Sequence, residues 1–277
     1  MQDEIVARLA NALNAQLIAA EARRAEKSAH PDSMDFYFQG LAWYNKGPAP
    51  ENLSRARGFF ERALALDPAN IDALVWMGTV DVARGAGIFS ADRTALLAAA
   101  EAAANNALSL APDHAASHFI MGLVQSFTNR ASEAIPEFER ALALDRNYAA
   151  AQGQIGFAKM ALGRGDETEA HVQEALRLSP RDPFAYLWAA FAGMAKLYVG
   201  RDEEAVAWLR RSIEFNRNYS TAHWFLAISF STARKVGRSP GSSWGRIDPR
   251  PHLHHPPLSR QCSERQSRLS GGTRARD

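Results

Sequence analysis

One recurring phrase constrains the fold of this chain more than any other feature. It reads "FFERALALDPAN" (59–70), "EFERALALDRNY" (137–148), "HVQEALRLSPRD" (171–182) and "WLRRSIEFNRNY" (208–219). The second and third copies start 34 residues apart, and the others keep nearly the same period. Each copy follows another helical stretch that carries a small residue, such as "HFIMGLVQSFTNR". A helical pair of this length cannot bury its own apolar face, so the sequence predicts stacked pairs.

The spacing of small and large residues resembles the tetratricopeptide repeat. In residues 115–148 the pattern's small positions hold Gly122, Ala134 and Ala141, and its large apolar position holds Phe138. Small residues at these places let two helices approach closely. The resemblance implies an all-α fold, a right-handed superhelical solenoid of stacked helix-turn-helix repeats. A non-repeating helical bundle is the alternative.

The repeats predict three segments. Residues 1–30 form a capping or connector helix, and residues 33–234 form the array, with five repeats and the first helix of a sixth. Residues 235–277 form a disordered basic tail, because Pro, Arg, Ser and Gly replace the helical pattern there. Inside the array two residues depart from the alanines of the repeat pattern, namely Thr168 and Ser212.

Residues 2–234 also resemble the repeat arrays of one group of bacterial proteins. Bacterial multidomain regulators carry such an array at the C-terminus, behind an adenylate cyclase domain or a winged-helix DNA-binding domain. The resemblance implies that this chain is the detached C-terminal part of a signalling protein, truncated at its N-terminus. Catalysis does not carry over, since a cyclase needs an α/β domain with two metal-binding carboxylates and no β-pattern exists here. We therefore expect no enzyme activity and no cofactor.

Composition limits the compartment and the partners. The single cysteine, Cys262, excludes a disulfide framework and favours a reducing compartment. No apolar run approaches the roughly 18–20 residues that cross a membrane, so we expect a cytoplasmic protein. Residues 235–277 carry a net charge of +6, which leaves about −4 for the rest of a chain whose total is +2. The array therefore gives no electrostatic reason to expect nucleic acid.

The resemblance implies that the first helix of each repeat lines a concave groove. Its groove positions carry aromatic and aliphatic side chains with few charges: Tyr37, Leu41, Tyr44, Asn45, Val75, Phe119, Leu123, Phe127, Phe157, Met160, Tyr198 and Trp224. Chaperone-binding members place Lys, Arg and Asn there instead. We therefore expect a protein or peptide partner with apolar anchors. Two alternatives stay open: several of these side chains are core residues, or the groove closes on a small metabolite as a sensor.

The scattered histidines show no catalytic pattern. His118 and His223 occupy the same position of two repeats, which predicts core or interface residues. Asp113 stands beside His114, and we expect it to be a helix N-cap and not the acid of an acid–base pair.

The tail contains the segment "HLHHPPLSRQC". His252, His254 and His255 suit Zn or Ni, yet no acid or second cysteine stands at structural-zinc spacing. We expect no metal site. Binding of nucleic acid through the tail's arginines is a further alternative.

A second interpretation of the tail is an out-of-frame translation from about residue 234. The genetic code permits residues 234–275 to arise from a reading shifted by one base, in which the sixth repeat regains its Gly, Ala and Pro. In either interpretation the sixth repeat lacks its second helix. The stripe of Trp224, Leu226 and Phe230 then stays partly exposed, which predicts self-association or aggregation.

Overall fold

The computed structural model describes three segments of the chain: 16–47, 49–86 and 92–236. Side chains are described as far as Phe230. The predictions made for the tail, which are its disorder, its histidines and its shifted reading frame, lie outside the described residues except at 235 and 236, which are helical and not disordered. So does the first half of the predicted N-terminal helix.

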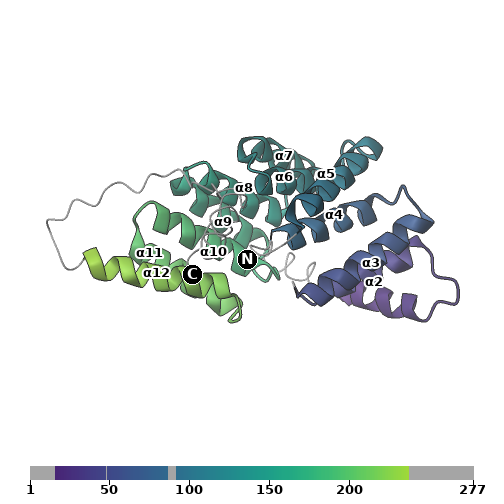
Figure 1. Cartoon of the computed structure of the whole chain (residues 1–277), viewed down its shortest axis with the longest axis horizontal. Coiled ribbons are helices and arrows are strands. Elements are labelled where there is room, and N and C mark those ends of the chain that lie inside the picture. Colours follow the sequence, from purple (N-terminus) through teal and green to yellow (C-terminus); the bar gives the residue numbers. More distant parts are fainter. Residues whose placement is uncertain (1–15, 48, 87–91, 237–277) are drawn as a thin grey trace, which may run out of the picture. The chain divides into compact units, whose positions relative to one another are not determined.

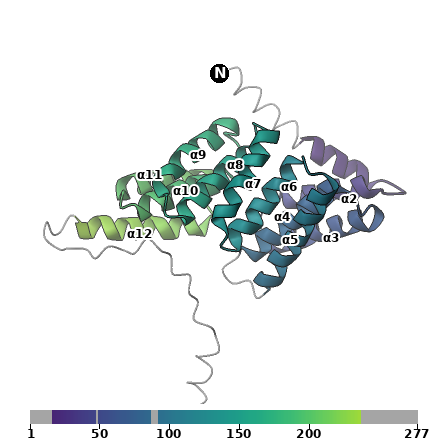
Figure 2. The same ribbon diagram turned by 90° about the horizontal axis from the view of Figure 1, so that it is seen from above.

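Every regular element in the described segments is a helix, and the helices follow one another in pairs (Figure 1). A helix over 16–26 comes first. The pairs are α2 (Ser33–Tyr44) and α3 (Pro50–Leu66), α4 (Ile71–Gly85) and α5 (Arg93–Leu110), α6 (Ala115–Phe127) and α7 (Ala131–Leu144), α8 (Ala149–Ala161) and α9 (Gly165–Leu178), and α10 (Ala185–Tyr198) and α11 (Asp202–Phe215). The helix α12 (Ser220–Val236) follows. Each helix packs mainly against its neighbours in sequence, as Figure 2 also shows. The predicted all-α fold is confirmed for the described residues.

Local signals explain where the first hairpin and the next one begin. At α2 the Asp32 carboxylate accepts a hydrogen bond from the Asp35 N–H at 2.8 Å, and the Asp35 carboxylate accepts one from the Asp32 N–H at 3.1 Å. This reciprocal pair satisfies backbone donors that a helix start leaves open. Pro50 opens α3, and Asn70 caps α4 through the Ala73 N–H at 2.9 Å.

The turns inside the later hairpins use left-handed backbone. Asn129 has φ +64° between α6 and α7, Gly163 has φ +77° between α8 and α9, and Gly200 has φ +75° between α10 and α11. A left-handed residue after a helix ends it and reverses the chain, and Gly or Asn adopt this conformation with least strain. The short turns therefore join antiparallel neighbours.

Within a hairpin, a glycine on the first helix faces a large side chain on the second. A Cβ built on Gly40 would lie 2.5 Å from the Phe60 ring, and one on Gly122 would lie 2.6 Å from the Phe138 ring. Phe60 and Phe138 are fully buried. The ring therefore fills the volume that a side chain would take, which holds the helices close together.

The two departures from the repeat pattern have a physical reason. The Thr168 hydroxyl donates to the Gly156 carbonyl oxygen at 3.0 Å, and the Ser212 hydroxyl donates to the Tyr186 carbonyl oxygen at 2.7 Å. Both side chains are fully buried, and each bond joins the two helices of one hairpin. A small hydroxyl thus replaces alanine without leaving a buried polar group unsatisfied.

Buried apolar clusters join one hairpin to the next. One cluster extends from Leu74 on α4 to Ile155 on α8, and a second joins α8 to α11 around Trp188. Trp188 lies against Gly153, where a Cβ would be 2.4 Å from the indole ring. Stacking therefore buries the faces that a single hairpin leaves exposed.

The structure corrects one capping prediction. His114, and not Asp113, is the N-cap residue of α6, and the Asp113 carboxylate instead forms an ion pair with Arg140 at 2.6 Å. Asp113 lies one residue too early to reach the first free N–H groups. The half-buried His118 contacts Glu137 at 2.7 Å and the Pro112 carbonyl at 2.8 Å, as an interface residue. The core or interface prediction is wrong for His223, which is exposed and contacts the Arg217 carbonyl at 2.9 Å.

Replacement by alanine should have opposite effects on stability at a glycine inside a hairpin contact and at a glycine outside one. Gly193→Ala should lower the free energy of unfolding by about 1–3 kcal/mol, because its Cβ would lie 2.7 Å from Leu209. Gly58→Ala should raise it by about 0.5–1 kcal/mol, because Gly58 is helical and has nothing within 4 Å of its Cβ position. Urea unfolding followed by circular dichroism measures both. Equal effects at the two sites would contradict the account.

Candidate functional site

The structure divides the predicted groove residues by exposure. Five are buried: Leu41, Tyr44, Val75, Leu123 and Met160. Four are half-buried: Tyr37, Phe119, Phe127 and Phe157. Asn45, Tyr198 and Trp224 are exposed, with 62% of Tyr198 and 68% of Trp224 accessible. Buried side chains contribute to the core here, so the half-buried and exposed ones are the accessible anchors.

Three phenylalanines form a row across the first helices of three consecutive hairpins. The Phe127 ring of α6 stacks on the Phe157 ring of α8, with 5.8 Å between centroids. Phe157 lies 4.7 Å from the Phe191 ring of α10. We call these three residues the phenylalanine row. Phe191 is buried, whereas Phe127 and Phe157 are only half-buried, so the row packs on the core clusters and offers aromatic surface at these two rings.

The prediction from sequence did not include Phe191. It stands in an alanine-rich stretch, "AAFAGM", away from the positions that the repeat pattern assigns to the groove. A single aromatic residue among alanines was the sequence signal that could have indicated Phe191. Only its contact with Phe157 shows that it belongs to the phenylalanine row.

Residues of the first and fifth hairpins meet at Tyr44. Its ring lies 4.9 Å from Trp76 and 5.8 Å from Phe184, which directly precedes α10. Phe184 lies 6.4 Å from Tyr186, and Tyr186 lies 4.8 Å from Tyr219. Segments far apart in sequence are therefore linked by aromatic contacts.

Five of the chain's six tyrosines belong to this region, which we call the tyrosine cluster: Tyr37, Tyr44, Tyr148, Tyr186 and Tyr219. Burial raises the pKa of Tyr37, Tyr44 and Tyr148 well above the usual value, and nearby negative charges add to the effect. Burial also raises the pKa of Asp182, although the Phe184 N–H donates to its carboxylate at 2.9 Å. The cluster thus brings phenols and one carboxyl into an environment that disfavours charge.

Cationic side chains near these helices are paired. Lys196 of α10 is buried and contacts Glu169 at 2.5 Å and Glu204 at 2.6 Å, which joins α9, α10 and α11. Lys159 of α8 contacts Glu167 at 3.0 Å. These lysines hold hairpins together and do not present free positive charge to a ligand.

Two observations limit other kinds of site. In the described part of the chain no group of three His, Cys, Asp or Glu side chains could hold a metal ion. No described helix has the length and apolar character needed to cross a membrane. A shallow cavity of about 310 Å³ lies between the helix over 16–26 and α2, and Asn45 and Trp43 are among its lining residues.

Helix α12 leaves apolar surface open. Besides Trp224, 45% of Phe230 is accessible, while Leu226 is half-buried. Arg210 of α11 approaches the Phe230 ring at 5.8 Å. Self-association through this helix stays a prediction.

Comparisons with known proteins agree with the hairpin geometry. A family model of the tetratricopeptide repeat matches residues 115–148, which comprise α6, α7 and the turn after them. No curated protein matches the chain in sequence. The predicted tetratricopeptide repeat is therefore supported directly for this hairpin.

Solved structures extend the similarity over most of the chain. A thermophilic TPR protein of Thermus thermophilus, TTC0263, has 18% identity and a TM-score of 0.58, and the match covers 72% of this chain and 99% of that one. The human IFIT1 dimer with m7Gppp-AAAA has 17% identity and a TM-score of 0.63, covering 83% of this chain and 55% of that one. At such identities the similarity shows the fold alone. The fold is that of a tetratricopeptide-repeat array.

The tyrosine cluster predicts a loss of stability at high pH. A tyrosine whose folded pKa is raised keeps its proton above about pH 10, while the unfolded chain loses it. The free energy of unfolding should therefore fall above that pH, by about 1.4 kcal/mol per pH unit for each such tyrosine.

Urea unfolding at a series of pH values measures this slope. Tyr148→Phe should make the fall shallower than in the wild type. Tyr198→Phe should make the fall shallower by less, because the Tyr198 ring is mostly exposed and burial raises its pKa less strongly. An unchanged slope in Tyr148→Phe would contradict the burial of this phenol.

Proposed function

We propose that the chain is a non-catalytic scaffold that binds a protein segment through apolar anchors along the phenylalanine row. The observation that carries the proposal is the contact of Phe127, Phe157 and Phe191 across three hairpins. The two half-buried rings, Phe127 and Phe157, lie on the first helices of successive hairpins and suit anchors spaced along one extended or helical segment, with the buried Phe191 supporting Phe157 from the core. The pairing of Lys159 and Lys196 with carboxylates favours apolar over anionic ligands.

The ion pairs of Lys159 and Lys196 also argue against nucleic acid as the ligand. The human IFIT1 structure contains m7Gppp-AAAA, but the likeness to this chain is one of fold. A site that follows a phosphate backbone needs unpaired cations, and the two lysines nearest the row in sequence are neutralised. We therefore propose a protein ligand.

The wider setting rests on the sequence alone. An origin as the detached C-terminal part of an adenylate cyclase-like regulator and residence in the cytoplasm belong to this proposal. The supporting features are the resemblance of residues 2–234 to such arrays and the single cysteine.

Selection of peptides on the purified chain tests the proposal. A phage library of random peptides of about 12 residues should yield sequences with two or three spaced aromatic or aliphatic anchors. Isothermal titration of synthetic copies should show a loss of roughly tenfold or more in affinity for Phe157→Ala. Phe157→Leu should lose less, because it keeps apolar volume while removing the ring stack.

Phe215→Ala is the matched control. Phe215 is an exposed phenylalanine on α11, the second helix of its hairpin, and its removal should leave affinity unchanged. Thermal unfolding of each variant checks that it folds. If no peptide is enriched, or if Phe127→Ala and Phe157→Ala both bind as the wild type does, the proposal is wrong.

A small-molecule sensor is the competing function, and the tyrosine cluster is the feature that favours it. Buried phenols around Asp182 could hold a polar group of a metabolite. A thermal-shift screen in which a metabolite stabilises the wild type but not Tyr186→Phe would support this alternative over the scaffold.

A further inference from the structure

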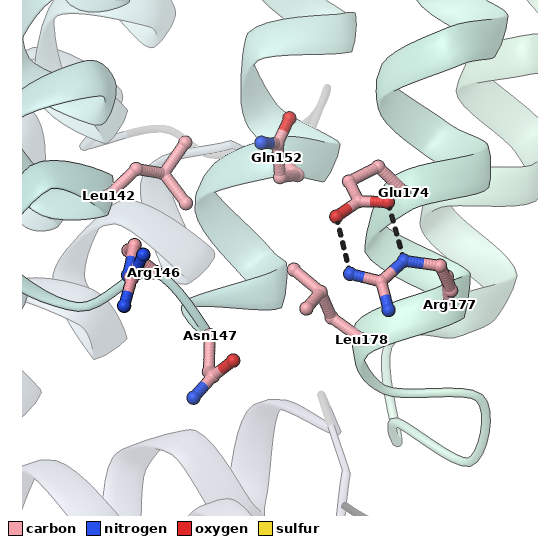
Figure 3. A pocket seen from close by; sticks show the side chains of 7 residues that line it. All are labelled: Leu142, Arg146, Asn147, Gln152, Glu174, Arg177 and Leu178. Atoms are coloured by element: carbon pink, nitrogen blue, oxygen red, sulfur yellow. Dashed lines mark hydrogen bonds and ion pairs between the residues drawn. The ribbon is translucent and has the colours of Figure 1, made fainter. Parts of the chain in front are cut away.

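A cleft of about 500 Å³ is lined by residues outside the phenylalanine row, although one of them shares helix α8 with Phe157 (Figure 3). One wall comes from the end of α7 and the turn that follows it, and the other comes from the last turns of α9. Gln152 of α8 lies between the walls. The volume is in the range of small-molecule sites.

Hydrogen-bond donors gather on the turn side of the cleft. Arg146 is exposed, and none of the described carboxylates forms an ion pair with it. The neighbouring Asn147 is fixed by its backbone N–H, which donates to the Asp145 carboxylate at 2.9 Å. The Gln152 carbonyl oxygen contacts His171 Nδ1 at 2.9 Å, which leaves the amide NH₂ of Gln152 to face a ligand.

On the opposite wall, Arg177 and Glu174 form an ion pair. Arg177 Nε lies 2.7 Å from Glu174 Oε2, and Arg177 Nη2 lies 2.8 Å from Glu174 Oε1, as the dashed lines in Figure 3 mark. This bidentate pair lowers the pKa of Glu174, so the carboxylate stays ionised and matched. The charge left over among the lining residues is the positive charge of Arg146.

Apolar surface completes the cleft. Leu142 of α7 and Leu178 of α9 are both half-buried and line it from its two walls. Each leucine belongs to the core on one side and is open to the cleft on the other.

We propose that this cleft binds an amphipathic acid. Its hydrocarbon part lies against Leu142 and Leu178, and its carboxylate or phosphate group accepts hydrogen bonds from Arg146. An acid without a hydrocarbon part would leave the leucines exposed, and a neutral chain would leave Arg146 unmatched. The cleft shares no residue with the phenylalanine row, so it binds independently of the proposed scaffold function.

The repeat itself supplies a structurally neutral variant. Arg146 stands where the other repeats carry Pro68, Pro112 and Pro180. Asp145, before it, has extended backbone at φ −134° and ψ 99°, which a following proline accepts. Arg146→Pro should therefore keep the turn while removing the guanidinium.

Isothermal titration with four probes below their micellar concentrations tests the proposal: octanoate, octyl phosphate, octanol and inorganic phosphate. At least one of the two octyl acids should bind, and octanol and inorganic phosphate should bind at least roughly tenfold more weakly. Binding of octanoate alone, octyl phosphate alone or both identifies the acid group and supports the proposal. Octanol that binds as tightly as the acids, or inorganic phosphate that does so, overturns it.

The variants localise the binding. Arg146→Pro and Arg146→Ala should each weaken the bound acid roughly tenfold. Arg217→Ala, at the equivalent exposed position two repeats later, should have no effect. Unchanged affinity in both Arg146 variants, with their thermal unfolding intact, overturns the proposal.

Discussion

The close contact between a glycine on the first helix of a hairpin and a large side chain on the second is the constraint on which the rest depends. It appears at Gly40 with Phe60, at Gly122 with Phe138 and at Gly193 with Leu209. Each contact fixes the distance between the two helices of a hairpin. That distance determines which helix faces stay uncovered within the hairpin and pack against its neighbours. Trp188 against Gly153 applies the same device between hairpins. The position of the phenylalanine row follows from this stacking.

Much of this could be predicted from the sequence because the packing is local. In three of the five described hairpins the glycine and its large partner are joined by a single loop, so their spacing in the sequence reveals the hairpin, and in the other two Gly78 and Gly156 face backbone and small side chains of the second helix. Thr168 and Ser212, which replace the alanines of the repeat pattern, are also small residues between the two helices of a hairpin. Each buried hydroxyl donates a hydrogen bond to a carbonyl oxygen on the facing helix. The Asp113 cap was wrong because the helix begins one residue later, with His114 as its N-cap, and the Asp113 carboxylate pairs with Arg140.

The candidate site was harder to predict, for a different physical reason. Whether a groove position is open depends on which side chains of the neighbouring hairpins pack against it, and these come from distant parts of the sequence. Leu41, Val75 and Leu123 are therefore core residues, and the contact of Tyr44 with Phe184 has no local signal. The contact of Phe191 with Phe157 and the position of Arg146 beside a cleft likewise become visible only once neighbouring hairpins are in place.

A double-mutant cycle on one glycine and its partner tests the central claim most directly. Unfolding free energies would be measured for the wild type, Gly122→Ala, Phe138→Leu and the combined variant. If the phenylalanine ring occupies the space that the glycine leaves free, the smaller leucine should relieve the clash. The combined variant should then be more stable than the sum of the single effects predicts, with a coupling of about 1 kcal/mol or more. Additive effects would contradict the account.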